Sequence, residues 1–175
     1  FEKFMDLGLK DAGTFQPTTA LSSRLLKALR DGLQGHTTGD AGGARAFTQL
    51  GCTAVRFNFR GVGASQGAWA QGPGEVDDAL AVAAAVRVPG LPLLLAGFSF
   101  GGYVASQVAE RLAGSADAAA HLVLVAPAAS RFDLARVPPD TLVIHGDADA
   151  IVPIEGSGLR THRAVPHSKL VTVGL

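Results

Sequence analysis

The sequence is poor in several residue types: it holds one cysteine, one methionine, one tryptophan and one tyrosine in 175 residues. Cys52 has no second cysteine, which excludes an internal disulfide and a cysteine-based zinc site, so we expect a small core residue. The 15 basic and 15 acidic side chains balance, so no excess charge favours nucleic acid or anionic lipid as a partner. The longest apolar runs, such as Ala79–Val86 and Leu91–Phe98, are shorter than the ~18 residues that a membrane-spanning helix needs.

These absences favour a soluble protein without a membrane partner, and the length suits one domain with a sizeable core. We expect a single domain over residues 1–175, with an atypical segment at 1–43 and a recognisable core at 52–175. Composition favours a cytoplasmic location, although the sequence given begins at Phe1 rather than at a methionine.

The strongest pattern lies at Leu91–Gly102, LPLLLAGFSFGG. A short apolar run ends in Gly97–Gly101 (GFSFG), and a helix-like segment, Tyr103–Leu112, follows it. A strand, G-x-S-x-G and a helix in this order form a nucleophile elbow, whose tight turn exposes the serine at the end of the strand. Ser99 is the predicted nucleophile, and the backbone N–H of Phe100, at the helix N-terminus, is the predicted oxyanion donor. The alternative is a Gly-rich turn that holds an ordinary serine.

Strand-like and helix-like segments alternate along the rest of the chain. The expected strands are Thr53–Phe59, Leu91–Ala96, His121–Val125, Thr141–His145 and Lys169–Val173, and the expected helices are Leu21–Leu33, Ala44–Leu50, Glu75–Val86, Tyr103–Leu112 and Leu159–Val165. Strands that are apolar throughout and separated by helices favour an α/β fold. We expect a mainly parallel, doubly wound sheet with helices on both faces.

The carboxyl ends of parallel strands are where functional groups gather, and Gly146–Pro153 (GDADAIVP) follows one such end. A catalytic serine needs a base, and the base needs a carboxylate that fixes its tautomer. Asp149 is the predicted carboxylate, and Asp147 is the alternative; an Asx-turn or helix cap is the structural role that either could have instead. The spacing lacks the glycine and the distal glutamate of a calcium loop, so no metal is predicted.

Two further loops frame the predicted site. Arg60–Gly67 (RGVGASQG) matches neither a P-loop nor a dinucleotide fingerprint, so no nucleotide cofactor is predicted. We expect a structural role beside the site, with a substrate wall as the alternative. Ala126–Asp140 is too short for a helical lid, which predicts an open site. The aromatic residues expected near it are Trp69, Phe98, Phe100 and Phe132, of which Phe98 and Phe100 are favoured as core rather than substrate wall.

Three blocks together resemble the α/β-hydrolase superfamily, and most of all small lid-poor bacterial hydrolases related to dienelactone hydrolases and serine esterases. The blocks are Val55–Trp69 with Gly74–Leu80, Gly97–Gly102, and Leu142–Pro153. Dienelactone hydrolases have a cysteine at the elbow, so the serine here resembles the esterase-like branch. The resemblance implies a serine hydrolase that cleaves a carboxylic ester or related acyl bond of a small molecule, with Ser99 as nucleophile and Asp149 as triad acid. The covalent route needs no cofactor.

The resemblance also implies a catalytic histidine after the last strand, and the sequence given shows none after Lys169–Val173. Without a base, a serine hydroxyl is a weak nucleophile at neutral pH. His145 and His36 are the alternative bases, although a core or solvated role is favoured for all five histidines, including His121, His162 and His167. The alternative function is a catalytically impaired hydrolase-like binding protein.

The amino-terminal segment departs from the family pattern as well. Phe1–Pro17 has no assignment, and a helix at Leu21–Leu33 is expected where the family has strands. The turn at Gly35–Thr37 is the candidate for the second oxyanion donor. We therefore expect a truncated, divergent or frame-altered copy of a hydrolase with an intact central block, and esterase, thioesterase and peptidase activities stay open as alternatives.

Overall fold

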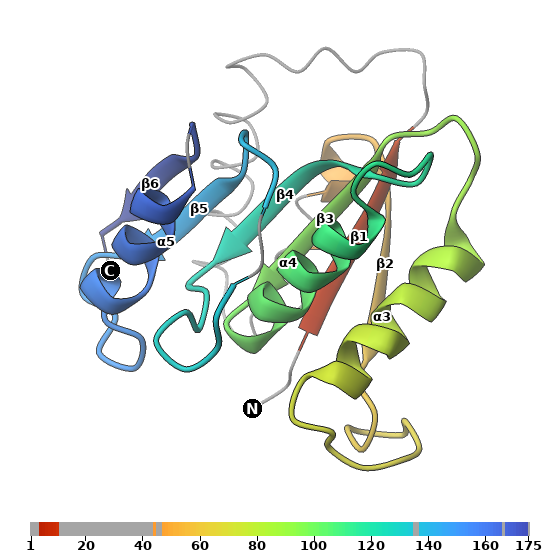
Figure 1. The fold of residues 1–175 in the computed structure, drawn as a ribbon, viewed down its shortest axis with the longest axis horizontal. Helices are drawn as coiled ribbons and strands as arrows, with labels where there is room; N and C mark the ends of the chain where they lie inside the picture. Colours follow the sequence, from red (N-terminus) through yellow and green to blue (C-terminus); the bar gives the residue numbers. More distant parts are fainter. Residues whose placement is uncertain (1–3, 11–43, 45–46, 135–136, 166, 175) are drawn as a thin grey trace.

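The computed structural model describes residues 4–10, 44, 47–134, 137–165 and 167–174, the first of these ranges by its backbone alone. A six-stranded sheet forms the centre, in the order β2-β1-β3-β4-β5-β6 (Figure 1). The elements are β1 (Phe4–Lys10), β2 (Cys52–Asn58), α3 (Pro73–Val86), β3 (Leu93–Phe98), α4 (Phe100–Leu112), β4 (Ala119–Val125), β5 (Leu142–Gly146), a 3₁₀ turn η1 (Ile154–Gly156), α5 (Gly158–Ala164) and β6 (Lys169–Val173).

The sheet is mainly parallel, as the sequence predicts. Strands β3, β4, β5 and β6 pair in parallel with their neighbours. The exception is β1, which pairs antiparallel with both β2 and β3, so that β2 and β3 run in the same direction on either side of it. No strand was expected within Phe1–Pro17, and the pairing of β1 with Cys52–Asn58 and with β3 is what defines it.

The predicted strands are all present, with ends that shift by up to two residues. Lys169–Val173 is found as predicted, whereas the strand expected from Leu91 begins at Leu93. Pro92 explains this shift because it has no N–H to donate to a sheet ladder. The helix expected from Tyr103 begins already at Phe100, directly after Ser99. The predicted helix Leu21–Leu33 lies outside the described residues.

Side chains of the sheet pack into a core on each face. On one face α3 and α4 cover Leu93, Leu95, Leu122 and Leu124, and Figure 1 shows these two helices in front of the sheet. On the other face Phe47, from the short helical stretch before β2, packs with Leu94, Ala96, Val123 and Ile144. The expected α/β fold is confirmed. Its two longest described helices, α3 and α4, pack against the face of the sheet that includes Leu93 and Leu95 of β3.

Two carboxylates tie the loop between β2 and α3 to the start of that helix. Glu75 is fully buried; its Oε1 accepts a hydrogen bond from Ala70 N and its Oε2 one from Gly72 N, both at 2.8 Å. Asp78 accepts from Nε of Arg60 at 2.8 Å and from Nη2 at 2.6 Å. The hydrogen bonds from Arg60 hold the pKa of Asp78 below its ordinary value. These contacts agree with the structural role expected for Arg60–Gly67.

Candidate active site

The turn at Ser99 has the strained geometry of a nucleophile elbow. Ser99 has φ 51° and ψ −116°, a region that residues other than glycine rarely occupy. Backbone hydrogen bonds hold it there. Ser99 N donates to Val125 O at 2.9 Å, and Ser99 O accepts from Gly102 N at 3.0 Å and from Ala128 N at 3.2 Å. The order of strand, strained serine and helix predicted from the sequence is therefore present.

The close approach of β3 and α4 explains the glycine two residues before the serine. A Cβ atom built on Gly97 would lie 2.5 Å from Gly102 N and closer still to the carbonyl group of Gly101. Those atoms are backbone and cannot rotate away, so a side chain at position 97 would force the strand and the helix apart. The sequence requirement for small residues around the serine follows from this contact.

The carboxyl ends of four parallel strands meet beside Ser99. The hydrogen bond from Ser99 N to Val125 O joins the ends of β3 and β4, and Ala126 N donates to Ile144 O of β5 at 2.8 Å. Asp147 N, just after β5, donates to Val173 O of β6 at 3.1 Å. The loops that follow these strands therefore lie at one edge of the sheet, as expected for a parallel sheet.

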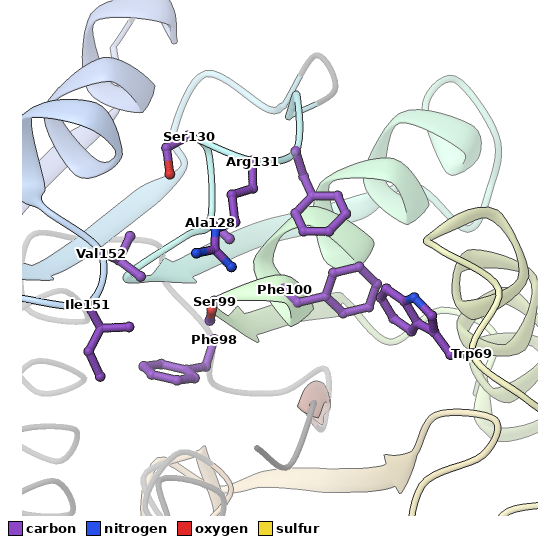
Figure 2. A pocket seen from close by; sticks show the side chains of 10 residues that line it. Trp69, Phe98, Ser99, Phe100, Ala128, Ser130, Arg131, Ile151 and Val152 are labelled. Atoms are coloured by element: carbon purple, nitrogen blue, oxygen red, sulfur yellow. The ribbon is translucent and has the colours of Figure 1, made fainter.

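A cleft of about 410 Å³ opens at this edge, with Ser99 in its wall (Figure 2). Its lining residues are Trp69, Phe98, Ser99, Phe100, Ala128, Ser130, Arg131, Phe132, Ile151 and Val152. Most of these are apolar, and Ile151 is 74 % exposed. Residues 126–134 and 137–140 form neither a helix nor a strand above it. The lining suits a ligand with an apolar part and a small number of polar groups.

The four aromatic residues expected near the site all line the cleft. The Phe100 ring centroid lies 4.6 Å from that of Trp69 and 5.0 Å from that of Phe132, spacings typical of favourable aromatic pairs. Phe100 is buried and belongs to the core, as predicted. For Phe98 the preference for a core position is wrong, because its side chain ends the strand at the rim and is 40 % exposed.

Asp149 lies in the loop that follows β5. Its Oδ1 accepts hydrogen bonds from Ile151 N and Val152 N, both at 2.9 Å. These are the contacts of an Asx-turn, the structural role given above as the alternative for Asp149. Its Oδ2 lies 3.9 Å from Nε2 of His145. Asp147 is exposed. The loop brings Ile151 and Val152 to the cleft, whereas Asp149 is not among the residues that line it.

His145, the described candidate for a replacement base, faces the acid loop rather than the cleft. Its side chain is fully buried, and Nε2 lies 2.6 Å from Val152 O. Since a carbonyl oxygen only accepts, Nε2 carries the proton in this contact. Nδ1 has no hydrogen-bond partner among the described residues and faces the backbone of Gly158, where a Cβ would lie 2.8 Å away.

The other described histidines lie away from the cleft lining. His162 Nδ1 contacts Ser168 Oγ at 2.7 Å, and His167 is exposed just before β6. Burial lowers the pKa of His121, and the nearby Asp140 partly opposes that shift. His36 and the turn Gly35–Thr37 lie outside the described residues. The described part of the chain thus brings no histidine into the lining beside Ser99.

Several cleft residues were missed by the sequence analysis, above all Ser130, Arg131 and Ile151. These residues follow the carboxyl ends of β4 and β5. That position is the one feature from which they could have been predicted, because they belong to no sequence motif. Among the residues that the structure describes, no helix is long and apolar enough to cross a membrane. The same residues contain no group of three or more histidine, cysteine, aspartate or glutamate side chains placed to hold a metal ion.

The fold, with its elbow between β3 and α4, is that of an α/β hydrolase. A family model described as serine aminopeptidase, S33, matches residues 28–139, which is more than half of the chain. The chain belongs to this family.

Solved structures and a curated relative are similar to this chain. An α/β serine hydrolase without a lid from Xanthomonas campestris shares 29% identity and a TM-score of 0.64, over 97% of this chain and 77% of that one. An α/β serine hydrolase homologue from Coxiella burnetii shares 25% identity and a TM-score of 0.59, over 97% and 81%. An uncharacterised Rickettsia prowazekii protein is 36% identical over 111 residues, 58% of this chain and 45% of that protein. The chain thus matches less than half the length of that relative.

Proposed function

We propose that this protein is a serine hydrolase that cleaves a carboxylic ester or related acyl bond of a small molecule. The observation that carries the proposal is Ser99, held at φ 51° between β3 and α4 in the wall of an open, mostly apolar cleft. Strain of this kind persists only where the surrounding structure imposes it, and it is common at catalytic positions. Membership of a hydrolase family supports the same proposal.

The proposed reaction is acyl transfer through a covalent intermediate. Ser99 Oγ bonds to the acyl carbon while its proton passes to a base, and the leaving oxygen departs with a proton as the carbonyl reforms. Water then attacks the acyl carbon of the acyl-enzyme, and the bond to Ser99 Oγ breaks. This step releases the carboxylic acid and returns a proton to the serine. The N–H of Phe100, at the first residue of α4, is the proposed donor to the oxyanion. Asp149 is the proposed acid that would orient the base.

The competing function is ligand binding by an impaired hydrolase. It is favoured by the placement of the described histidines, none of which lines the cleft beside Ser99. Both functions use the same cleft, and they differ in whether Ser99 is activated.

Covalent labelling with a fluorophosphonate, followed by intact mass, separates the two functions. We expect one added label in the wild type, none in Ser99→Ala, and unchanged labelling in Ser130→Ala, which removes the other serine of the cleft lining. A folded wild type that stays unlabelled would contradict the hydrolase proposal and favour the binding function. Labelling that persists in Ser99→Ala would exclude Ser99 as the nucleophile.

A further inference from the structure

Arg131 is the charged side chain of the cleft: every other described residue of its lining is uncharged. Figure 2 shows its side chain extending from the loop after β4 into the cleft, with the guanidinium directed toward Ser99. Arg131 is exposed in this open cleft, and a cation beside the proposed nucleophile attracts anionic ligands and repels cationic ones.

The loop that carries Arg131 is fixed to the elbow itself. Ala128 N donates to Ser99 O at 3.2 Å, and Arg131 N donates to Ala128 O at 3.0 Å. From the other side, Arg160 Nη1 donates to Ala129 O at 2.8 Å. The backbone of Arg131 is therefore held at a defined place relative to Ser99, which lowers the entropy that a ligand contact would cost.

The guanidinium of Arg131 is not used by the described part of the protein. The nearest acid along the chain, Asp133, already pairs with Arg160, whose Nη2 lies 3.1 Å from Asp133 Oδ1. Within the described ranges, no ion pair or hydrogen bond of the Arg131 side chain is present. Its five N–H donors are left to solvent or to a ligand.

We infer that Arg131 binds a carboxylate of the substrate, so that the preferred substrates are acyl compounds with a carboxylate close to the scissile bond. Guanidinium and carboxylate match in geometry and form paired, charge-assisted hydrogen bonds. One cation in the described lining suits one negative charge, and the apolar side chains around it suit the carbon chain that carries it. The inference rests on the proposed function in treating this ligand as a substrate.

The same observation disfavours a substrate with a free amine next to the scissile bond. An ammonium group near Ser99 would face the Arg131 guanidinium, and the described lining has no carboxylate to pair with it. Like charges at short range repel. The inference therefore separates this cleft from one that binds the amino terminus of a peptide.

Binding to the intact protein tests the inference without requiring turnover. The sequence has a single tryptophan, and Trp69 lines the cleft, so its fluorescence reports occupancy. We would titrate hydrocinnamate and its neutral amide, hydrocinnamide, into the wild type, Arg131→Gln and Arg163→Gln. Arg163 is an exposed arginine of α5 that is absent from the lining, which makes it a matched control.

We expect the wild type and Arg163→Gln to bind the acid roughly fivefold more tightly than the amide, the upper size typical of an ion pair at an exposed side chain. Arg131→Gln should bind the two equally, with its affinity for the amide unchanged. Equal binding of acid and amide by the wild type, or a preference for the acid that survives in Arg131→Gln, would overturn the inference.

Fluorophosphonate labelling of the same samples keeps the two proposals apart. A preference for the acid in a protein that is not labelled would support the carboxylate site and contradict the hydrolase proposal. Labelling of Ser99 without any preference for the acid would support the hydrolase proposal and contradict the carboxylate site.

Discussion

The carboxylate of Asp149 and the imidazole of His145 lie 3.9 Å apart, measured from Oδ2 to Nε2. Both groups already bind the backbone that follows Asp149, since Nε2 contacts Val152 O and Oδ1 accepts from Ile151 N and Val152 N. Asp149 thus has an observed structural role, as the acceptor in this turn, and a proposed catalytic role. Substitutions at this one position can separate them.

Asp149→Asn should keep the fold and lose reactivity. The amide oxygen of asparagine can still accept from Ile151 N and Val152 N, whereas its NH₂ group cannot stabilise a charged base. If Asp149 is the triad acid, the rate of fluorophosphonate labelling falls by roughly 100-fold or more, while thermal unfolding shows little change. Asp149→Ala should lose both the turn and the reactivity. An asparagine variant that is labelled at the wild-type rate would assign Asp149 to the turn alone.

Gly97→Ala should unfold the elbow or prevent folding. The added Cβ would meet the backbone of Gly101 and Gly102, so we expect a loss of roughly 3 kcal/mol or more in the free energy of unfolding. Gly156→Ala is the matched control, because a Cβ there meets only Ser130 Cβ at 3.8 Å, and it should change stability by about 0.5 kcal/mol or less. Urea denaturation measures both. Equal stability of the two variants would show that the strand and helix can separate at little cost.

Glu75→Gln should destabilise the protein through its backbone partners. Glutamine offers one acceptor where the carboxylate offers two, so either Ala70 N or Gly72 N would face an NH₂ group in a buried place. We expect a cost of about 1–3 kcal/mol in chemical denaturation. Glu155→Gln, at an exposed position, serves as the control and should have little effect. A silent Glu75→Gln variant would mean that water replaces the lost acceptor.

The ion pair between Arg60 and Asp78 should make the stability of the fold depend on pH in the acidic range. Because Arg60 lowers the pKa of Asp78 in the folded state, the ionised pair stabilises the fold above the ordinary aspartate pKa of about 3.9. That contribution is lost as the pH falls through the lowered folded-state value. Asp78→Asn lacks it at every pH. The difference in Tm between wild type and variant should therefore be present at neutral pH and shrink below pH ~4; a difference that stays constant would argue against the pair as its source.

Much of the site's backbone was predictable because its signals are local. The apolar run before Ser99, the glycines around it and the helix after it are neighbours in sequence, and they form one turn in the structure. Asp149 could be placed in a loop at the right edge of the sheet for the same reason, since a buried strand directly precedes it.

The parts that escaped prediction depend on contacts between distant residues. Strand β1 alternates apolar and polar residues over only a short run, MDLGLK, and its place in the sheet is set by its partners in β2 and β3. The sequence around Arg131 does not indicate that its side chain is directed toward Ser99, as Figure 2 shows. The exposure of Phe98 also depends on the end of the strand, which lies two residues beyond the predicted one.

The position of β1 has a consequence for the order in which the molecule assembles. Phe4–Lys10 is synthesised before both of its partners, which are Cys52–Asn58 on one side and Leu93–Gly97 on the other. One edge of β1 can pair once Cys52–Asn58 has been made, whereas the other stays open until the elbow strand has been made. Open edges are where strands of different chains pair wrongly. Such long-range pairing is also slow to form. The strand that presents Ser99 is thus the one that completes the pairing of β1.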